Sequence, residues 1–315
     1  MVSSVSCIGL LAISMMILMV QARPSLDFNL EDFGDQQKDM DVIYDEVDRS
    51  ENDVDEVTEC VDYKSSPGIY KVFSEIPRPK PCGLYLVAPV DQQIELTFLD
   101  FQVHCQQHGI VEIVDGYAYG NGIFPPQEGS GQTSRIDRHK RYCGAHKPSS
   151  VFLSTSNAAV IQNRMPNDNE GFTVQVKFIK NPQPCNAVAM EERGVVTLTN
   201  YGLAHNCSLL ILFPQRLSVT FGYTQARAEV PPRHHGQGSD YLEILGGNSS
   251  SVDKMISFER SAGLSSDFRL KRRIPCENVV VRLISSGRFI NSAQIHHETL
   301  SQDETSGSSR SQCFL

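Results

Sequence analysis

The sequence predicts an all-β protein in which two tandem antiparallel β-sandwiches follow a disordered, acidic N-terminal arm. A short strand pattern that ends in a turn occurs twice, as GIVEIVDGYAYGNG from Gly109 and as GSDYLEILGGNSSS from Gly238. Two copies of one pattern so far apart indicate a duplicated domain. Many short apolar–polar alternations, abundant Gly and Pro, and almost no helical periodicity indicate sandwiches of strands.

The first 22 residues are predicted to be a signal peptide. The apolar run from Ile8 to Val20 is 13 residues long, whereas a membrane span needs roughly 20. Small residues ending at Ala22 fit a cleavage site. A membrane anchor is the alternative, because the segment lacks the basic residue that usually begins a signal peptide. We therefore expect a secreted, extracellular protein with no membrane insertion.

The acidic residues are concentrated in residues 23–56, the predicted arm. Between Asp27 and Glu59 the chain has 14 acidic and 2 basic residues, a balance of −12, while the whole chain carries −9. A segment this acidic and this poor in apolar residues is typical of a disordered tail that folding does not require. The alternative is an arm that attracts a basic peptide. The charge distribution gives no indication of nucleic acid binding.

The cysteines predict a disulfide framework. Without Cys7, which lies in the signal peptide, eight cysteines remain, and an even number in a secreted chain indicates disulfides. Cys60 and Cys82 are 22 residues apart, as are Cys185 and Cys207. The count alone leaves 105 connectivities open. Two acceptor sequons predict glycosylation at Asn206 and Asn248.

Corresponding segments follow in each half. The segments PCGLYLVAPVDQQIELTF and NCSLLILFPQRLSVTF predict strands, as do IVEIVDG and YLEILGG. Each half then ends in a predicted strand pair, SVFLSTSN with GFTVQVKF and NVVVRLISSG with the weaker NSAQIHHETL. The predicted domains are residues 57–181 and residues 185–315, the latter with a C-terminal tail. The short, proline-containing linker between them predicts that the sandwiches abut.

The first half resembles the CUB domain, an extracellular antiparallel β-sandwich. The resemblance rests on the order of LTFLDFQVHC, VEIVDG, the Tyr142–Gly144 triplet YCG and the closing GFTVQV. The second half is similar to a more divergent CUB-like module. It keeps SDYLEILGG and lacks a counterpart of the Cys105 and Cys143 pair.

Residues 57–315 as a whole resemble the corticotropin-releasing factor-binding protein family. The resemblance rests on CSLLILFPQRLSVTF, DYLEILGG, PCENVVVRLISSGRFIN and a last cysteine in the tail. A further cysteine pair of that family, expected near Gln237 and near Ser261 to Leu264, is missing here. The resemblance implies pairing between nearest neighbours along the chain, which gives Cys60–Cys82, Cys105–Cys143, Cys185–Cys207 and Cys276–Cys313.

The resemblance also implies a function and two binding residues. It implies a secreted, non-enzymatic protein that sequesters a corticotropin-releasing-factor-like peptide of the diuretic-hormone class and limits receptor activation. The alternative is a CUB-type matrix or adhesion protein that binds a large partner. In the resembled family, binding involves an arginine four residues before the first cysteine and an aspartate two residues after it, and the chain has Glu56 and Asp62 there.

The charge reversal at Glu56 leaves alternatives open. We expect Asp62 to meet a cationic or amide donor of the peptide. Glu56 then either makes no contact or selects a more basic hormone. The alternative role of Asp62 is to cap the turn after Cys60.

No catalytic motif and no cofactor is predicted. The chain has no HExxH, no GxSxG and no glycine-rich phosphate loop. Zinc is the alternative for the histidine pairs, but loop or strand positions are the favoured interpretation of His104, His108, His234, His235, His296 and His297. Calcium is the alternative for Asp240, because CUB domains often bind it near this place, yet its companion acids are lacking. We expect Asp240 to cap a turn.

Two basic runs are predicted to be surface charge. Arg138-His139-Lys140-Arg141 has the spacing of a proprotein-convertase site, but its place beside Cys143 favours a solvated basic turn. Lys271-Arg272-Arg273 is likewise expected on the surface.

Overall fold

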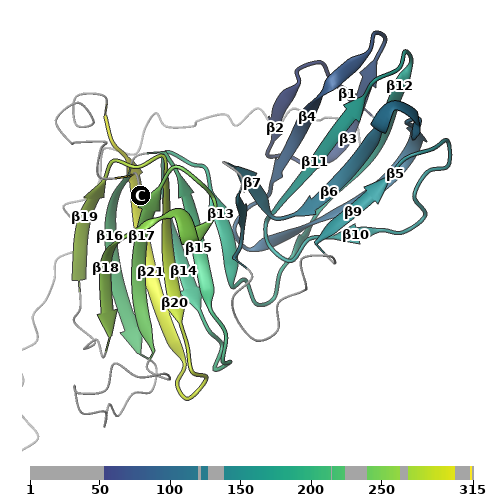
Figure 1. Cartoon of the computed structure of the whole chain (residues 1–315). Helices are drawn as coiled ribbons and strands as arrows, with labels where there is room; N and C mark the ends of the chain where they lie inside the picture. The colour runs from purple at the N-terminus through teal and green to yellow at the C-terminus, as the bar shows by residue number, and fades with distance from the viewer. Residues whose placement is uncertain are drawn as a thin grey trace, which may run out of the picture. The chain divides into compact units, whose positions relative to one another are not determined.

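The computed structural model describes residues 53–119, 122–126, 138–213, 215–223, 240–262, 269–301 and 313. These residues form two β-sandwiches, whose strands Figure 1 draws from purple to teal in the first and from teal-green to yellow in the second. The all-β prediction is confirmed. The only helices in the described ranges are two 3-10 turns, η1 (Gln106–His108) and η2 (Val252–Lys254). No helix in these ranges combines the length and apolar character needed to cross a bilayer.

The first sandwich consists of two five-stranded sheets. One sheet has the order β1-β3-β12-β5-β10, with strands β1 (Val54–Val57), β3 (Gly68–Ser74), β12 (Glu170–Lys180), β5 (Gln92–Gln102) and β10 (Phe152–Leu153). The other has the order β2-β4-β11-β6-β9, with β2 (Val61–Lys64), β4 (Arg78–Val87), β11 (Ala158–Met165), β6 (Ile110–Asp115) and β9 (His139–Tyr142). A separate hairpin pairs β7 (Tyr117–Tyr119) with β8 (Gly122–Phe124).

The second sandwich repeats this plan with nine strands. Its five-stranded sheet has the order β13-β15-β20-β17-β18, with β13 (Asn186–Ala189), β15 (Cys207–Leu212), β20 (Asn278–Ile284), β17 (Tyr241–Gly247) and β18 (Ile256–Ala262). Its four-stranded sheet has the order β14-β21-β16-β19, with β14 (Arg193–Thr199), β21 (Asn291–Thr299), β16 (Gln215–Tyr223) and β19 (Arg269–Ile274). The segment predicted as the weaker strand is thus a full central strand, β21.

Three edge pairs are parallel, in contrast to the antiparallel prediction. They are β1 with β3, β2 with β4, and β13 with β15. In each case the strand between them in sequence lies in the opposite sheet. The chain therefore crosses over before it returns, which is the connection that parallel pairing requires.

Two boundaries differ from the sequence-based expectation. The predicted disordered arm, residues 23–56, overlaps β1, in which Asp55 and Glu56 pair with Tyr70 and Lys71. Residues 23–52 of the arm lie outside the described residues. In SVFLSTSN only Phe152 and Leu153 form a strand. The long strand is β11, whose first four residues are all buried. It was missed because a strand buried on both faces shows no alternation.

Each sandwich has its own apolar core. In β5 the buried residues alternate as Ile94, Leu96 and Phe98, and the Phe98 ring lies 5.4 to 5.8 Å from the rings of Phe101, Tyr142 and Phe172. The second core contains residues such as Leu209, Ile211, Leu217, Val219 and Ile295. The structure contains the four disulfides that the family resemblance implies: Cys60–Cys82, Cys105–Cys143, Cys185–Cys207 and Cys276–Cys313.

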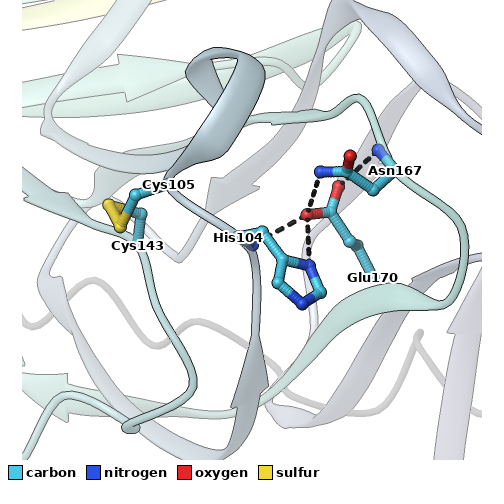
Figure 2. A network of polar contacts seen from close by, with 5 residues as sticks. All are labelled: His104, Cys105, Cys143, Asn167 and Glu170. Atoms are coloured by element: carbon cyan, nitrogen blue, oxygen red, sulfur yellow. Dashed lines mark hydrogen bonds and ion pairs between the residues drawn. A yellow bond between two sulfur atoms is a disulfide. The ribbon is translucent and has the colours of Figure 1, made fainter.

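A buried carboxylate at the start of β12 joins two loops of the first sandwich (Figure 2). The side chain of Glu170 is fully buried, and its partner His104 directly precedes the disulfide-bonded Cys105. It accepts hydrogen bonds from the backbone N–H of His104 at 2.7 Å and of Asn167 at 2.9 Å, and it contacts both of their side chains at 3.0 Å. Burial by itself would raise the pKa of this carboxyl, but the hydrogen bonds from Asn167 and His104 outweigh burial and lower it.

We expect Glu170→Gln to lower the free energy of unfolding by about 1–3 kcal/mol at neutral pH, because buried donors lose a charged acceptor. The pKa of Glu170 is lower in the folded chain than in the unfolded chain. Its contribution is therefore complete above the ordinary carboxyl pKa and is lost as the pH falls through the folded-state pKa. Urea unfolding at neutral pH and at about pH 3 measures this change.

The control is Glu95→Gln, which removes a surface contact with Lys177 of 3.9 Å and is expected to change stability by less than about 1 kcal/mol. A difference between parent and Glu170→Gln that stays constant from neutral to acid pH would contradict this account.

Candidate functional site

An apolar layer lies between the two sandwiches. The first sandwich contributes Val87, Tyr117, Phe124 and Ala158, and the second contributes Val188, Leu210, Leu212, Leu245, Val252, Met255 and Val280. In β15 all six residues are buried, because Leu209 and Ile211 face the core while Leu210 and Leu212 face this layer. The continuous apolar run CSLLIL therefore reflects burial on both faces. The predicted abutment of the sandwiches is confirmed.

Two polar contacts fix this interface. The buried side chain of Asn157 donates to the carbonyl of Val188 at 2.8 Å and accepts from its N–H at 2.7 Å, so it pairs with β13 as a strand would. The fully buried hydroxyl of Ser250 bonds the backbone of Tyr119, with an N–H to oxygen distance of 3.1 Å and an O–H to carbonyl distance of 3.0 Å. Gly122 lies so close that a Cβ there would be 2.3 Å from the Ser251 nitrogen.

Four tyrosines line the border of the interface on the side of the first sandwich. Tyr63 in β2 is the register partner of Tyr85 in β4, and their rings stack with centroids 4.8 Å apart. The rings of Tyr85 and Tyr117 are 5.5 Å apart. Tyr85 donates its hydroxyl to the carbonyl of Ala118 at 3.1 Å.

The environment raises the pKa of three of these phenols above the ordinary value, at which they are already neutral at physiological pH. Burial raises the pKa of Tyr85 and of Tyr117, and the neighbouring Tyr63 adds to both increases. The negative charge of Glu277 raises the pKa of Tyr119, whose hydroxyl lies 3.2 Å from the Glu277 carboxylate. These hydroxyls therefore act as hydrogen-bond donors or acceptors, not as anions.

A cavity of about 550 Å³ opens between these tyrosines and the second sandwich. We name it the tyrosine cavity; it is lined by Tyr63, Tyr117, Tyr119, Leu212, Phe213, Asn248, Pro275, Glu277, Asn278 and Cys313. Tyr63, Tyr119 and Phe213 are 45%, 42% and 55% exposed. A second cavity of about 420 Å³ shares Tyr63 and adds Lys64, Val87, Met190 and Glu191 among its lining residues. Exposed aromatic side chains around a cavity are typical of binding sites.

The comparisons with known proteins agree over both sandwiches. The model of the corticotropin-releasing factor binding protein N-terminal domain matches residues 52–180, and that of the C-terminal domain matches residues 187–306. The chain belongs to the corticotropin-releasing factor-binding protein family. Both models describe a binding protein.

Curated relatives carry the same name. The corticotropin-releasing factor-binding proteins of Xenopus laevis and Mus musculus are 27% and 26% identical to this chain, over 76% of it and over 76% and 75% of their own lengths. The human protein is 24% identical over 76% of this chain and 75% of its own length.

Solved structures give weaker matches. The CUB1-EGF-CUB2 domains of rat MASP-1 match 78% of this chain and 100% of that chain at 12% identity, with a TM-score of 0.27. The extracellular region of zebrafish Gpr126/Adgrg6 matches 79% of this chain and 38% of that chain at 10% identity, also with a TM-score of 0.27.

In this corticotropin-releasing factor-binding protein family member, Asp62 and Glu56 lie in different sheets. Asp62 is in β2, immediately before Tyr63; it accepts the Tyr63 N–H at 2.7 Å and pairs with Lys64 at 3.2 Å. Glu56 is in β1 and pairs with its register partner Lys71 at 3.0 Å, with its side chain 68% exposed. Asp62 lies on the face of β2 opposite to Tyr63, because its register partner Leu84 points into the first core whereas Tyr85 faces the other tyrosines. Neither Asp62 nor Glu56 is among the residues that line the tyrosine cavity.

The two predicted glycosylation sites lie in different surroundings. Asn206 is half-buried directly before Cys207, which is buried and disulfide-bonded. Asn248 lines the tyrosine cavity, and the hydroxyl of its sequon residue Ser250 is occupied by Tyr119. Glycosylation at both stays a prediction.

Of the residues considered as metal ligands, His234 and His235 lie outside the described residues, and His108 and His296 are exposed. Hydrogen bonding or burial accounts for His104, His297 and Asp240. His104 contacts Glu170, and His297 is buried with a pKa that burial lowers. His205 lies near Cys185 and Cys207, but their sulfurs form a disulfide and provide no thiolate for a metal. Asp240 accepts bonds from the Ser286 N–H at 2.6 Å and from the Asn291 side chain, which is the expected capping role.

The prediction of a solvated basic turn at Arg138-His139-Lys140-Arg141 was wrong. Arg138 is only 5% exposed, and its guanidinium donates to the carbonyls of Asp115 and Pro125. The next three residues belong to β9, which pairs with β6. Backbone carbonyls thus satisfy a buried cation that sequence alone placed in water.

We expect Asn157→Ala to lower the free energy of unfolding by about 2–5 kcal/mol, because it leaves the N–H and the carbonyl of Val188 buried without partners. Urea unfolding measures the loss. Gln175→Ala, at a half-buried position of β12, is the control and is expected to cost less than about 1 kcal/mol. Equal stability of Asn157→Ala and the parent would show that this contact does not hold the sandwiches together.

Proposed function

We propose that this chain is a secreted binding protein that holds a corticotropin-releasing-factor-like peptide of the diuretic-hormone class and so limits activation of the peptide's receptor. The relatives that it matches over 76% of its length are named for binding corticotropin-releasing factor. The observation that most supports the proposal is the tyrosine cavity, which both sandwiches build. Sequestration requires no catalysis, because a peptide held here cannot occupy a receptor.

The chemistry of the tyrosine cavity suits a peptide. Tyr63, Tyr119 and Phe213 offer exposed aromatic surface, and buried aromatic anchors dominate the binding energy of most protein interfaces. Glu277, beside the Tyr119 hydroxyl, offers an acceptor for a cationic side chain. Tyrosine faces also attract Lys and Arg through their π-electrons. We propose that the peptide inserts apolar and cationic side chains between the two sandwiches.

Asp62 and Glu56 have different parts in this proposal. Asp62 is connected to the second cavity through its ion pair with Lys64, which lines that cavity. A cationic or amide donor of the peptide would share or replace Lys64 as its partner. Glu56 lies in the other sheet and is paired with Lys71, which supports the alternative in which it makes no contact with the hormone.

We expect Tyr63→Ala to weaken binding of corticotropin-releasing-factor-class peptides by at least about tenfold, the loss typical of a central aromatic anchor. Calorimetry of the full chain against a panel of such peptides measures this. Phe73→Ala is the matched control, because Phe73 is an exposed aromatic residue in β3 of the opposite sheet. Equal losses in both variants, or no loss in Tyr63→Ala, would place the binding site elsewhere.

We expect Asp62→Asn to weaken the same peptides about three- to tenfold, with less effect at high salt, because a partly exposed charge contributes a screened interaction. Glu56→Gln should leave the affinity unchanged. Thermal unfolding of both variants verifies the fold. If Asp62→Asn binds the peptides as tightly as the parent, the role of Asp62 is its local hydrogen bond with the Tyr63 N–H. If Glu56→Gln weakens peptide binding, the hypothesis that Glu56 selects a more basic hormone gains support.

A further inference from the structure

The outer face of the sheet β14-β21-β16-β19 carries a band of positive charge. In each strand alternate residues face the core, such as Val196, Leu198, Ala293, Ile295, Leu217 and Val219. The residues between them face outward. Register aligns Arg193, Glu298, Arg216 and Arg273 in one row across the four strands, and Val195, His296, Ser218 and Lys271 in the next.

These side chains are accessible and predominantly cationic. Arg193 and Arg216 are 81% and 39% exposed, and Lys271 and Arg273 are exposed as well. Glu298 is the single acid in the two described rows and is shared by Arg216 at 3.0 Å and Arg193 at 4.0 Å. Four cations and one carboxylate give these rows a formal charge of +3 when His296 is neutral.

The band is also hollowed. A groove of about 700 Å³ follows it and is lined by Arg193, Arg216, Lys271, His296 and Glu298 together with the neighbouring strand residues. Adjacent strands are about 4.8 Å apart, so a row across four strands spans roughly 14 Å. That length is enough for several successive charges of an extended polymer. None of the residues that line the tyrosine cavity lies in this groove.

We propose that this cationic groove binds a linear sulfated polysaccharide of the extracellular matrix. An anion is the partner that fits, because the described rows of the groove carry a formal charge of +3 although the whole chain carries −9. Guanidinium groups match sulfate and carboxylate oxygens in a bidentate manner, and clusters of Lys and Arg on a surface are typical heparin sites. Four disulfides indicate an oxidising compartment, where sulfated polysaccharides are the abundant polyanions.

This binding would be separate from peptide capture. The groove lies on β14, β16, β19 and β21, whereas the tyrosine cavity is built from β2, β7, β15 and the residues next to β17 and β20. A chain bound to polysaccharide through the groove keeps the tyrosine cavity accessible. The consequence is a peptide-binding protein that is retained at the matrix where it is released.

The probe is heparin, with the full secreted chain. We expect the parent to bind a heparin column at physiological salt, and Arg193→Gln/Lys271→Gln to elute at lower salt with roughly tenfold weaker affinity in calorimetry, because two charge contacts are lost. The slope of log affinity against log salt should fall by about two. Lys140→Gln/Lys147→Gln removes the same charge from exposed positions of the first sandwich and should behave as the parent.

Several outcomes would overturn the proposal. The proposal is wrong if the parent does not bind heparin. It is also wrong if both double variants lose the same heparin affinity. Equal binding of desulfated heparin would exclude recognition of sulfate. Stronger binding to DNA or to anionic phospholipid vesicles than to heparin, lost in the same variant, would assign the groove to another polyanion. Affinity for corticotropin-releasing-factor-class peptides should be unchanged in all variants, so failure here is distinguishable from failure of the tyrosine cavity.

Discussion

The burial of β15 and β20 on both faces is the constraint on which the candidate site depends. Leu209 and Val281 complete the core of the second sandwich, while Leu210 and Val280 on the same strands need a cover that this sandwich cannot supply. The outer side of β4 and β11 supplies that cover. At Gly122 the two sandwiches approach so closely that a Cβ there would be 2.3 Å from the Ser251 nitrogen.

The tyrosine cavity is a consequence of this contact. The tyrosines of β2, β4 and β7 border the apolar layer, and the second sandwich adds Phe213, Glu277 and the disulfide-bonded Cys313. Each sandwich supplies only part of the residues that line the cavity. Peptide binding in the tyrosine cavity would therefore require the interface between the sandwiches. Polyanion binding in the cationic groove would not, because all of its lining residues belong to the second sandwich. The proposed binding of a peptide and a polyanion to one chain at the same time requires this separation of the two surfaces.

The sequence predicts the features that follow from alternation and from cysteine spacing. Ile94, Leu96 and Phe98 alternate, so β5 could be predicted, and the matching spacings of Cys60–Cys82 and Cys185–Cys207 indicated the duplication. The strand β11 and the buried Arg138 could not be predicted in this way, because their burial depends on distant partners. Neither could the stacking of Tyr63 on Tyr85, which follows from a crossover between sheets. The runs CSLLIL and NVVVRLI were an available signal for the interface, since a strand without alternation is buried on both sides.

Hydrogen exchange of the full chain, with and without a bound peptide of the corticotropin-releasing factor class, tests the central claim most directly. The account predicts that the peptide slows exchange in β2 and around Phe213 and Glu277, where both sandwiches line the tyrosine cavity. It predicts no change in β1 and β3, where Glu56 pairs with Lys71. Protection confined to β1 and β3, or to the strands of a single sandwich away from the cavity, would contradict the claim that the peptide binds between the sandwiches.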